Sequence, residues 1–269
     1  MTDLAGVKVV VTGATSGLGA AMADALLQAG ATVAMAARPT PRLEEAVAAR
    51  NGDGLAAQAL PMDVRDPASV SAASRGLLER WGRVDLVVNN AGIGMRTVNP
   101  RFFEEPRPFF EVSEDKFIDV VSTNLTGYFL VARAFAGYFV SQGQGRLINV
   151  SMNHETMRRR GFVPYGPSRA GAEALSLIMT EDLRPYGVAV NVLLPGGATA
   201  TGMIPEELPE AAKSGLLPPE IMGPPVVFLA SAEAEGLTGE RIVAVEFDAW
   251  LNRFRAAPTP QTNPASGPG

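Results

Sequence analysis

The sequence predicts an α/β protein with a single doubly wound, seven-stranded parallel sheet that carries helices on both faces. Short apolar runs, typical of strands buried on both faces, alternate along the chain with amphipathic stretches of helical period. Strands that alternate with helices are joined by crossovers, and crossovers give parallel pairing. The 269 residues, 46% of them hydrophobic, suffice for one large domain with a sizeable core.

The first strand–helix–strand unit, residues 7–38, organises the rest of the chain. Its apolar run VKVVV ends at Thr12, and Gly13, Gly17 and Gly19 follow with the spacing G-x-x-x-G-x-G. A helix then runs to Gly30, and residues 31–37 form the second strand. Glycines let the backbone approach a phosphate, and a helix N-terminus attracts one. The unit therefore predicts a pyrophosphate-binding loop; the alternative is a tight turn without a ligand.

The other elements are expected in alternation along the remaining chain. We expect helices over residues 41–50, 66–81, 113–140 with a kink near Gly127, 164–186 and 220–230. We expect strands over residues 55–60, 84–88, 147–151, 188–194 and 242–247.

Three segments have little periodicity. Residues 95–110 form a long connection near the carboxyl edge of the sheet, where ligands bind, so we expect this segment to be either functional or mobile. Residues 198–219 read as a lid over the substrate, within a segment of about 196–222. The domain is expected to span 1–255, and the Pro-, Gly- and Ser-rich tail 256–269 to be disordered.

Composition excludes several classes of function. The net charge of −5 gives no basic surface for nucleic acid. No cysteine is present, so we expect no disulfide, no thiolate chemistry and no Cys-ligated metal, and no other metal site is predicted. The chain starts without a charged-then-apolar signal and has no apolar run of about 18 residues. We therefore expect a cytoplasmic protein without membrane association.

The motifs, in their order, resemble those of the short-chain dehydrogenase/reductase family over residues 7–247. The matching pieces are the phosphate loop TGATSGLG at 12–19, Asp63-Val64, the turn NNAG at 89–92, Asn124 in TNLTG, Tyr165 in YGPSR, and Pro195-Gly196. The resemblance implies a Rossmann-type fold and hydride transfer between a nicotinamide cofactor and a small carbonyl or alcohol substrate. It makes Tyr165 the acid/base and gives Asn124 the ordering of a water.

The same resemblance assigns residues to the cofactor and to catalysis. Cofactor binding is expected at Gly13, Thr15, Ser16, Gly17, Leu18, Gly19, Arg38, Asp63, Val64, Asn90, Ala91, Gly92, Tyr165, Arg169, Pro195, Gly196 and Thr199. The catalytic set is Tyr165, Arg169, Asn124, Ser151 and Met152. Ala37 stands where an acid would hold an NAD ribose, whereas Arg38 suits a 2′-phosphate, so NADP(H) is expected in preference to NAD(H). The alternative is that Arg38 is an ordinary surface residue.

Two positions depart from the family pattern. Arg169 stands four residues after Tyr165, where the family has lysine; it keeps the charge but cannot give up a proton. Met152 stands 13 residues before Tyr165, where the family usually has serine, and a thioether donates no hydrogen bond. Ser151, one residue earlier, should point away if the strand continues through it, unless a bulge re-aims it.

Other side chains have two readings each. His154, the single histidine, is either a general base or a solvated loop residue. Arg158, Arg159 and Arg160 either steer an anionic substrate or form a solvated basic turn. The aromatic residues of the long connection either line an apolar substrate pocket or pack that loop, and they are Phe102, Phe103, Phe109 and Phe110.

Two alternatives to an oxidoreductase remain, and both keep the scaffold. One is a redox-silent, nucleotide-sensing protein. The other is chemistry of the halohydrin dehalogenase type, which resembles this family and carries Tyr-x-x-x-Arg; the intact phosphate loop at 12–19 argues against it. The long helices expected at 113–140 and 165–186 resemble those that build family oligomers, and both carry apolar residues on more than one face. A homodimer or homotetramer is therefore expected.

Overall fold

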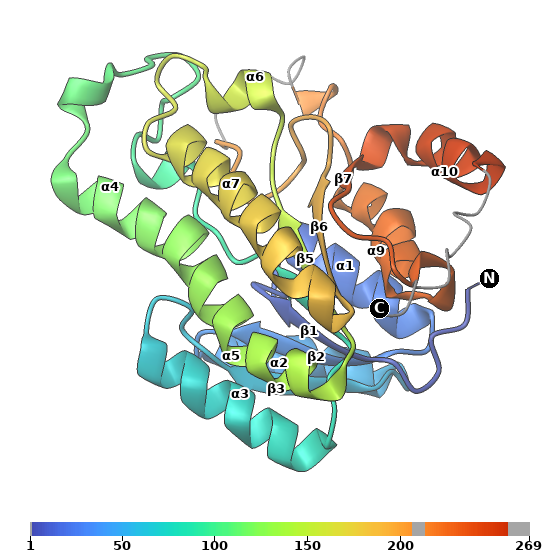
Figure 1. Ribbon diagram of the computed structural model, residues 1–269. Helices are drawn as coiled ribbons and strands as arrows, with labels where there is room; N and C mark the ends of the chain where they lie inside the picture. Colours follow the sequence, from blue (N-terminus) through green and yellow to red (C-terminus); the bar gives the residue numbers. More distant parts are fainter. Residues whose placement is uncertain (1, 206–212, 258–269) are drawn as a thin grey trace, which may run out of the picture.

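A seven-stranded parallel sheet forms the centre of the computed structural model, which describes residues 2–205 and 213–257 (Figure 1). The strand order is β3-β2-β1-β4-β5-β6-β7, and every neighbouring pair is parallel. The strands are β1 (Lys8–Thr12), β2 (Thr32–Ala37), β3 (Ala57–Pro61), β4 (Leu86–Asn89), β5 (Gly145–Val150), β6 (Val188–Leu194) and β7 (Arg241–Val243). The predicted doubly wound fold is confirmed, and the order reverses between β1 and β4, where such folds bind ligands.

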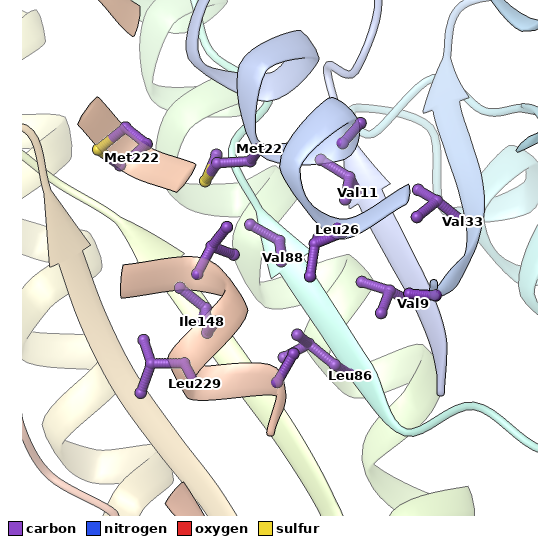
Figure 2. Close-up of a cluster of buried hydrophobic side chains, with 14 of the residues drawn as sticks. Val9, Val11, Met22, Leu26, Val33, Leu86, Val88, Ile148, Met222 and Leu229 are labelled. Atoms are coloured by element: carbon purple, nitrogen blue, oxygen red, sulfur yellow. The ribbon is translucent and has the colours of Figure 1, made fainter. Parts of the chain in front are cut away.

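Helices cover both faces of the sheet and divide the core into two layers. One face carries α1 (Gly17–Gln28), α2 (Pro41–Gly52) and α9 (Gly223–Ala230). The other face carries α3 (Pro67–Trp81), α5 (Gly127–Gln142) and α7 (Tyr165–Leu183). Figure 2 shows the first layer, where Met22 and Leu26 of α1 pack over strand residues such as Val9 and Val88.

The ends of α3 follow from its sequence. The Asp66 carboxylate accepts a hydrogen bond from the Ala68 amide at 3.0 Å, and Pro67 opens the helix without needing a partner for its nitrogen. Gly82 ends the helix at φ 70°, a conformation that favours glycine.

A π-helical stretch interrupts the long helix that the sequence predicts over residues 113–140. The segment consists of α4 (Glu114–Val121), five π-helical residues Ser122–Thr126, and α5. Gly127 comes directly after the π-helical turn, and a Cβ there would lie 3.0 Å from the Val64 side chain. The change in helical geometry thus falls beside the predicted kink, and it contains Asn124. Single π-helical turns are frequent at functional sites.

The expected last strand, 242–247, is wrong in length. β7 ends at Val243, a short 3-10 helix (Ala244–Glu246) follows, and α10 (Phe247–Ala256) was not predicted. The apolar run that suggested a long strand instead supplies Phe247 to a cluster of rings in which Trp250 and Phe254 stack at 5.3 Å. The four-residue helix α6 (His154–Met157) was also not predicted.

Two other expected segments fall partly outside the described residues. Of the predicted lid, residues 206–212 lie outside them, while its flanks meet in a parallel bridge between Thr199 and Leu217. Of the predicted tail, residues 258–269 lie outside them, and Ala256 closes α10. No described helix is long and apolar enough to cross a bilayer, and residues 2–205 and 213–257 hold no cluster of three potential metal ligands.

Candidate functional site

A cavity of about 830 Å³ receives most of the residues that the sequence singles out. Its walls include residues that follow β1, β2, β3, β4, β5 and β6, so it lies at the carboxyl edge of the sheet. The predicted residues on its wall are Gly13, Thr15, Ser16, Gly17, Leu18, Arg38, Asp63, Val64, Asn90, Ala91, Gly92, Ser151, Met152, Tyr165, Arg169, Pro195, Gly196 and Thr199. Gly19 and Asn124 do not line it.

The three glycines of the phosphate loop are required for different structural reasons. Gly13 and Gly17 have φ of 66° and 54°, which other residues rarely adopt. A Cβ on Gly13 would lie 2.9 Å from the Ala91 Cα, and a Cβ on Gly19 would overlap the Gly13 carbonyl oxygen. Gly19 therefore lets α1 pack closely against the loop, and its contact with a cofactor stays a prediction. Within residues 2–205 and 213–257 the Ser16 side chain makes no capping hydrogen bond to α1, so it leaves the first-turn amides at the cavity to other partners.

Thr12 joins the phosphate loop to the NNAG turn. Its buried hydroxyl donates to the Val88 carbonyl at 3.2 Å and accepts from the amides of Asn90 and Ala91 at 2.9 and 3.0 Å. The Asn90 side chain donates back to the Thr12 carbonyl at 2.9 Å. Sequence reasoning placed Thr12 in the phosphate loop but did not predict this link to the NNAG turn, although a polar residue at the end of a buried strand was the available signal.

Three arginines surround one end of the cavity. Arg38, Arg42 and Arg65 all line it, and the sequence had singled out only Arg38. The Arg65 guanidinium donates to the Asp63 carboxylate at 2.9 and 3.1 Å, and these hydrogen bonds hold the pKa of Asp63 below its usual value, with Arg38 acting in the same direction. Asp63 and Asp119 on the same wall pair with Arg65 and offset part of this charge, so Arg38 and Arg42 are left as the cations that suit a phosphate.

Tyr165 and Arg169 meet at the start of α7. The guanidinium carbon of Arg169 lies 5.4 Å from the centre of the Tyr165 ring and 5.4 Å from that of Tyr128. The Arg169 Nη1 donates to the Tyr128 hydroxyl at 2.5 Å and to the Val150 carbonyl at 2.9 Å. The predicted pair is therefore brought together, and Tyr128 is a third member that sequence reasoning missed.

Arg169 is charged although its side chain is buried. Burial opposes the charge, but the phenol oxygens of Tyr128 and Tyr165 outweigh it and raise the pKa of Arg169. Burial likewise raises the pKa of Tyr128, although Arg169 opposes that rise, so Tyr128 is neutral near pH 7. Nη2 of Arg169 lies 2.5 Å from where a Cβ on Gly92 would stand, so the guanidinium spans from Tyr128 to the NNAG turn.

Ser151 and Met152 both reach the cavity. β5 ends at Val150, so Ser151 lies outside the strand, and the alternation that would turn it away does not apply. The Ser151 hydroxyl is buried and has no hydrogen-bond partner among the residues that the structure describes, which leaves it available to a bound molecule. Met152 packs against an apolar cluster formed by Met95, Phe102 and Phe162.

Asn124 binds the protein's own backbone. Its side-chain oxygen accepts from the Ile93 amide at 2.9 Å, and its side-chain nitrogen donates to the Ile93 carbonyl at 3.0 Å and to Ser168 at 3.2 Å. Asn124 thus fixes the segment after the NNAG turn, and the ordering of a water stays a prediction.

The remaining candidates separate by position. His154 does not line the cavity; its side chain is 56% exposed and its Nε2 lies 2.8 Å from Oε2 of Glu173. Among the three consecutive arginines, Arg159 alone lines the cavity. Phe102 and Phe103 line it as well, whereas Phe109 and Phe110 are 69% and 74% exposed on the surface.

Comparisons with known proteins agree with this geometry. A family model described as short chain dehydrogenase matches residues 7–211. The 3-oxoacyl-(acyl-carrier-protein) reductase of Vibrio cholerae is 30% identical over 249 residues, which cover 89% of this chain and 96% of that protein. A putative gluconate dehydrogenase of Agrobacterium tumefaciens has a similar structure, with TM-score 0.81, 27% identity and coverage of 91% and 97%. So does a gluconate 5-dehydrogenase of Burkholderia cenocepacia in complex with NADP and tartrate, with TM-score 0.80, 26% identity and coverage of 92% and 97%.

Proposed function

The chain belongs to the short-chain dehydrogenase family, and on that premise we propose that it is an NADP(H)-dependent oxidoreductase acting on a carbonyl or alcohol substrate. The observation that supports this most is a single cavity that is lined by three features. These are the start of α1, the three arginines and the Tyr165–Arg169 pair. The first two features suit the phosphates of a dinucleotide. The third provides an acid at the place of reaction.

The residues present fit such a cofactor. Gly13 and Gly17 line the cavity with backbone alone, in a turn whose positive φ values favour glycine, and Arg38, with Arg42 and Arg65 beside it, would hold a 2′-phosphate. Asp63 and Val64 would contact the adenine, and the turn at Pro195-Gly196 would lie beside the nicotinamide with Thr199. When bound, the nicotinamide supplies or accepts the hydride.

The chain's own residues manage the proton and the charge. Tyr165 gives its phenol proton to the carbonyl oxygen in reduction and takes a proton from the alcohol in oxidation. The buried charge of Arg169, 5.4 Å from the Tyr165 ring, stabilises the phenolate that this transfer leaves. Arg169 does not relay a proton, because a guanidinium stays protonated, so Tyr165 is reprotonated by another route.

Few side chains at the end of β5 can donate a hydrogen bond that polarises the substrate carbonyl. Met152 supplies no donor at the family's serine position, and the unpartnered hydroxyl of Ser151 is the remaining donor at the end of β5. Loss of one such donor commonly costs about 100- to 1,000-fold in rate. We therefore expect a low turnover number unless Ser151 replaces the missing hydroxyl.

Steady-state oxidation of NADPH with a panel of aldehydes and ketones tests the proposal. The protein should consume NADPH with at least one of them, and Tyr165→Phe should remove that turnover although the variant still binds NADPH. A protein that binds NADPH yet reduces nothing in a broad panel contradicts the proposal.

A redox-silent, nucleotide-sensing role is the second candidate, favoured by Met152 and by the inward hydrogen bonds of Arg169 to Tyr128 and Val150. The double variant Met152→Ser and Arg169→Lys, which restores the family's residue types, separates the two. A large gain in NADPH-dependent turnover supports a detuned reductase. Tight NADPH binding with no gain supports the sensor.

A further inference from the structure

The contacts order the cavity into a polar end and an apolar end. Tyr165 packs against the apolar cluster of Met95, Phe102 and Phe162, and its ring lies 5.4 Å from the Arg169 guanidinium carbon. Arg169 in turn abuts Gly92 of the NNAG turn, which adjoins the phosphate loop through Asn90. Tyr165 therefore stands at the border, and a substrate whose carbonyl reaches its hydroxyl has its body in the apolar end.

Arg159 is the charged side chain of that apolar end. It lines the cavity, and its guanidinium carbon lies 5.5 Å from the ring centre of Phe162 and 5.7 Å from that of Phe103. Within residues 2–205 and 213–257 no ion pair involves Arg159. The other charged residues on the wall are Arg169 at the border and, at the polar end, Arg38, Arg42, Asp63, Arg65 and Asp119.

The turn that carries Arg159 is fixed from two sides. It follows α6 at the end of the molecule to which the connection after β4 also extends (Figure 1). The Phe162 amide donates to the Arg159 carbonyl at 3.2 Å, and the Phe162 ring meets Phe102 edge-on at 5.6 Å. Gly161, at φ 80°, lies against Pro106 so closely that a Cβ would come within 2.6 Å of it. Arg159 is thus held at the wall by both segments.

From this placement we infer that Arg159 selects the substrate: an apolar carbonyl compound that carries a carboxylate on the end remote from the carbonyl. This inference rests on the proposed function and adds the substrate class. A guanidinium over aromatic rings keeps its planar fork of donors free for a carboxylate. An apolar wall with a single cation accepts the body of such a compound and fixes which end points to Tyr165.

Matched substrate pairs test the inference. The para and meta isomers of carboxybenzaldehyde and their methyl esters share an aromatic body and a carbonyl but differ in charge. In the wild-type protein, kcat/KM with NADPH should favour the acid of at least one isomer by about tenfold or more. Arg159→Ala should lower the value for that acid by about 10- to 100-fold, mostly through KM, and change the ester by less than about twofold.

The same turn offers a matched control. Arg160 is exposed, as Arg159 is, but it does not line the cavity, so Arg160→Ala should leave both members of the pair unchanged. Arg159→Lys should retain part of the preference for the acid, because it keeps the charge but not the fork. Equal losses for acid and ester in Arg159→Ala, or a wild-type preference for the ester, would overturn the inference.

Calorimetry separates this inference from the proposed function. The corresponding hydroxymethylbenzoate and its methyl ester are titrated into the protein alone and with NADP⁺. Binding of the carboxylate that is lost in Arg159→Ala, with no aldehyde reduced in any assay, supports the anion site and contradicts the oxidoreductase. Reduction of neutral aldehydes without any carboxylate effect supports the oxidoreductase and contradicts the anion site.

Discussion

The Arg169 guanidinium and the Tyr128 hydroxyl form a buried hydrogen-bonded pair, with 2.5 Å between Nη1 and the phenol oxygen. The hydroxyl donates onward to the Val150 carbonyl at 3.1 Å, and the same carbonyl accepts from Arg169 at 2.9 Å. The Tyr128 hydroxyl and the Val150 carbonyl therefore fix the guanidinium beside Tyr165. A lysine, which the family has at this position, lacks the planar guanidinium that donates to both groups. Tyr128 therefore orients the side chain that is specific to this chain, Arg169.

Removal of the Tyr128 hydroxyl should destabilise the protein, because a buried cation loses a partner. We expect Tyr128→Phe to lower the free energy of unfolding by about 1–3 kcal/mol, measured by urea denaturation. Tyr138→Phe on the same helix is the control, since its hydroxyl bonds the Gly82 carbonyl at an exposed site, and it should cost less. An equal loss of unfolding free energy in the two variants would show that the Tyr128–Arg169 hydrogen bond stabilises the protein no more than an exposed one.

The residues after β5 give a prediction on rate. If Ser151 is the remaining polarising donor, Ser151→Ala should lower kcat by about 100-fold or more. Met152→Ser, which restores a hydroxyl at the family's position, should raise kcat over the wild-type protein. Both are read from steady-state rates at saturating NADPH. An unchanged rate in both variants would show that residues 151 and 152 do not polarise the substrate carbonyl.

Cofactor choice should depend on Arg38. Arg38→Ala should weaken NADPH binding by about 10- to 100-fold through loss of a charge-assisted contact to the 2′-phosphate, and leave NADH within about twofold. Fluorescence titration gives both dissociation constants. Arg80→Ala, an exposed arginine on α3 away from the cavity, is the control. Tighter binding of NADH than NADPH by the wild-type protein would contradict the preference.

The ion pair of Asp63 with Arg65 predicts a dependence of stability on pH. The Arg65 hydrogen bond lowers the pKa of Asp63 in the folded protein, so the folded state favours the ionised carboxylate. This stabilisation is present above the usual pKa of about 3.9 and is lost as the pH falls through the lower, folded value. The stability difference between the wild-type protein and Asp63→Asn should therefore shrink on acidification in denaturation curves. A difference that stays constant to the lowest pH at which the protein folds would contradict it.

The expected oligomer has a candidate surface. Exposed apolar side chains lie on α4, α5 and α7, and they are Phe117, Ile118, Phe129, Leu177 and Ile178, between 42% and 62% exposed. We expect Leu177→Lys to shift a dimer or tetramer toward monomer in light scattering. Phe110→Lys, at an exposed aromatic residue outside these helices, should not. A wild-type monomer would contradict the expectation.

The fold was predictable because its determinants are local. Apolar runs bounded by turn residues located all seven strands, and the Asp66–Pro67 start of α3 is recognisable from two residues. α10 was missed because its first residue continues an apolar run that reads as a strand. Its helical state depends on tertiary contact, since Phe247, Trp250 and Phe254 pack on Phe228.

The site was predictable only where a motif marks it. The phosphate loop, Tyr165 and Arg169 follow from spacing, and the structure places them on one cavity. Tyr128 could not be found, because its contact with Arg169 spans 41 positions in the chain and depends on how α5 crosses α7. The sequence could not distinguish Arg159 from its neighbours Arg158 and Arg160, because the difference lies in space. In the part of the chain that the structure describes, the Arg159 guanidinium alone is placed over the rings of Phe103 and Phe162.

Hydride transfer with Tyr165 as the acid is the central claim, and isotope tracing tests it most directly. The protein is incubated with an accepted aldehyde and with NADPH that carries deuterium in the transferable position at C4, and the alcohol is analysed by mass spectrometry. We predict one deuterium on the former carbonyl carbon with the wild-type protein and no alcohol with Tyr165→Phe, which still binds NADPH. Alcohol without deuterium, or labelled alcohol formed equally fast by Tyr165→Phe, would contradict it.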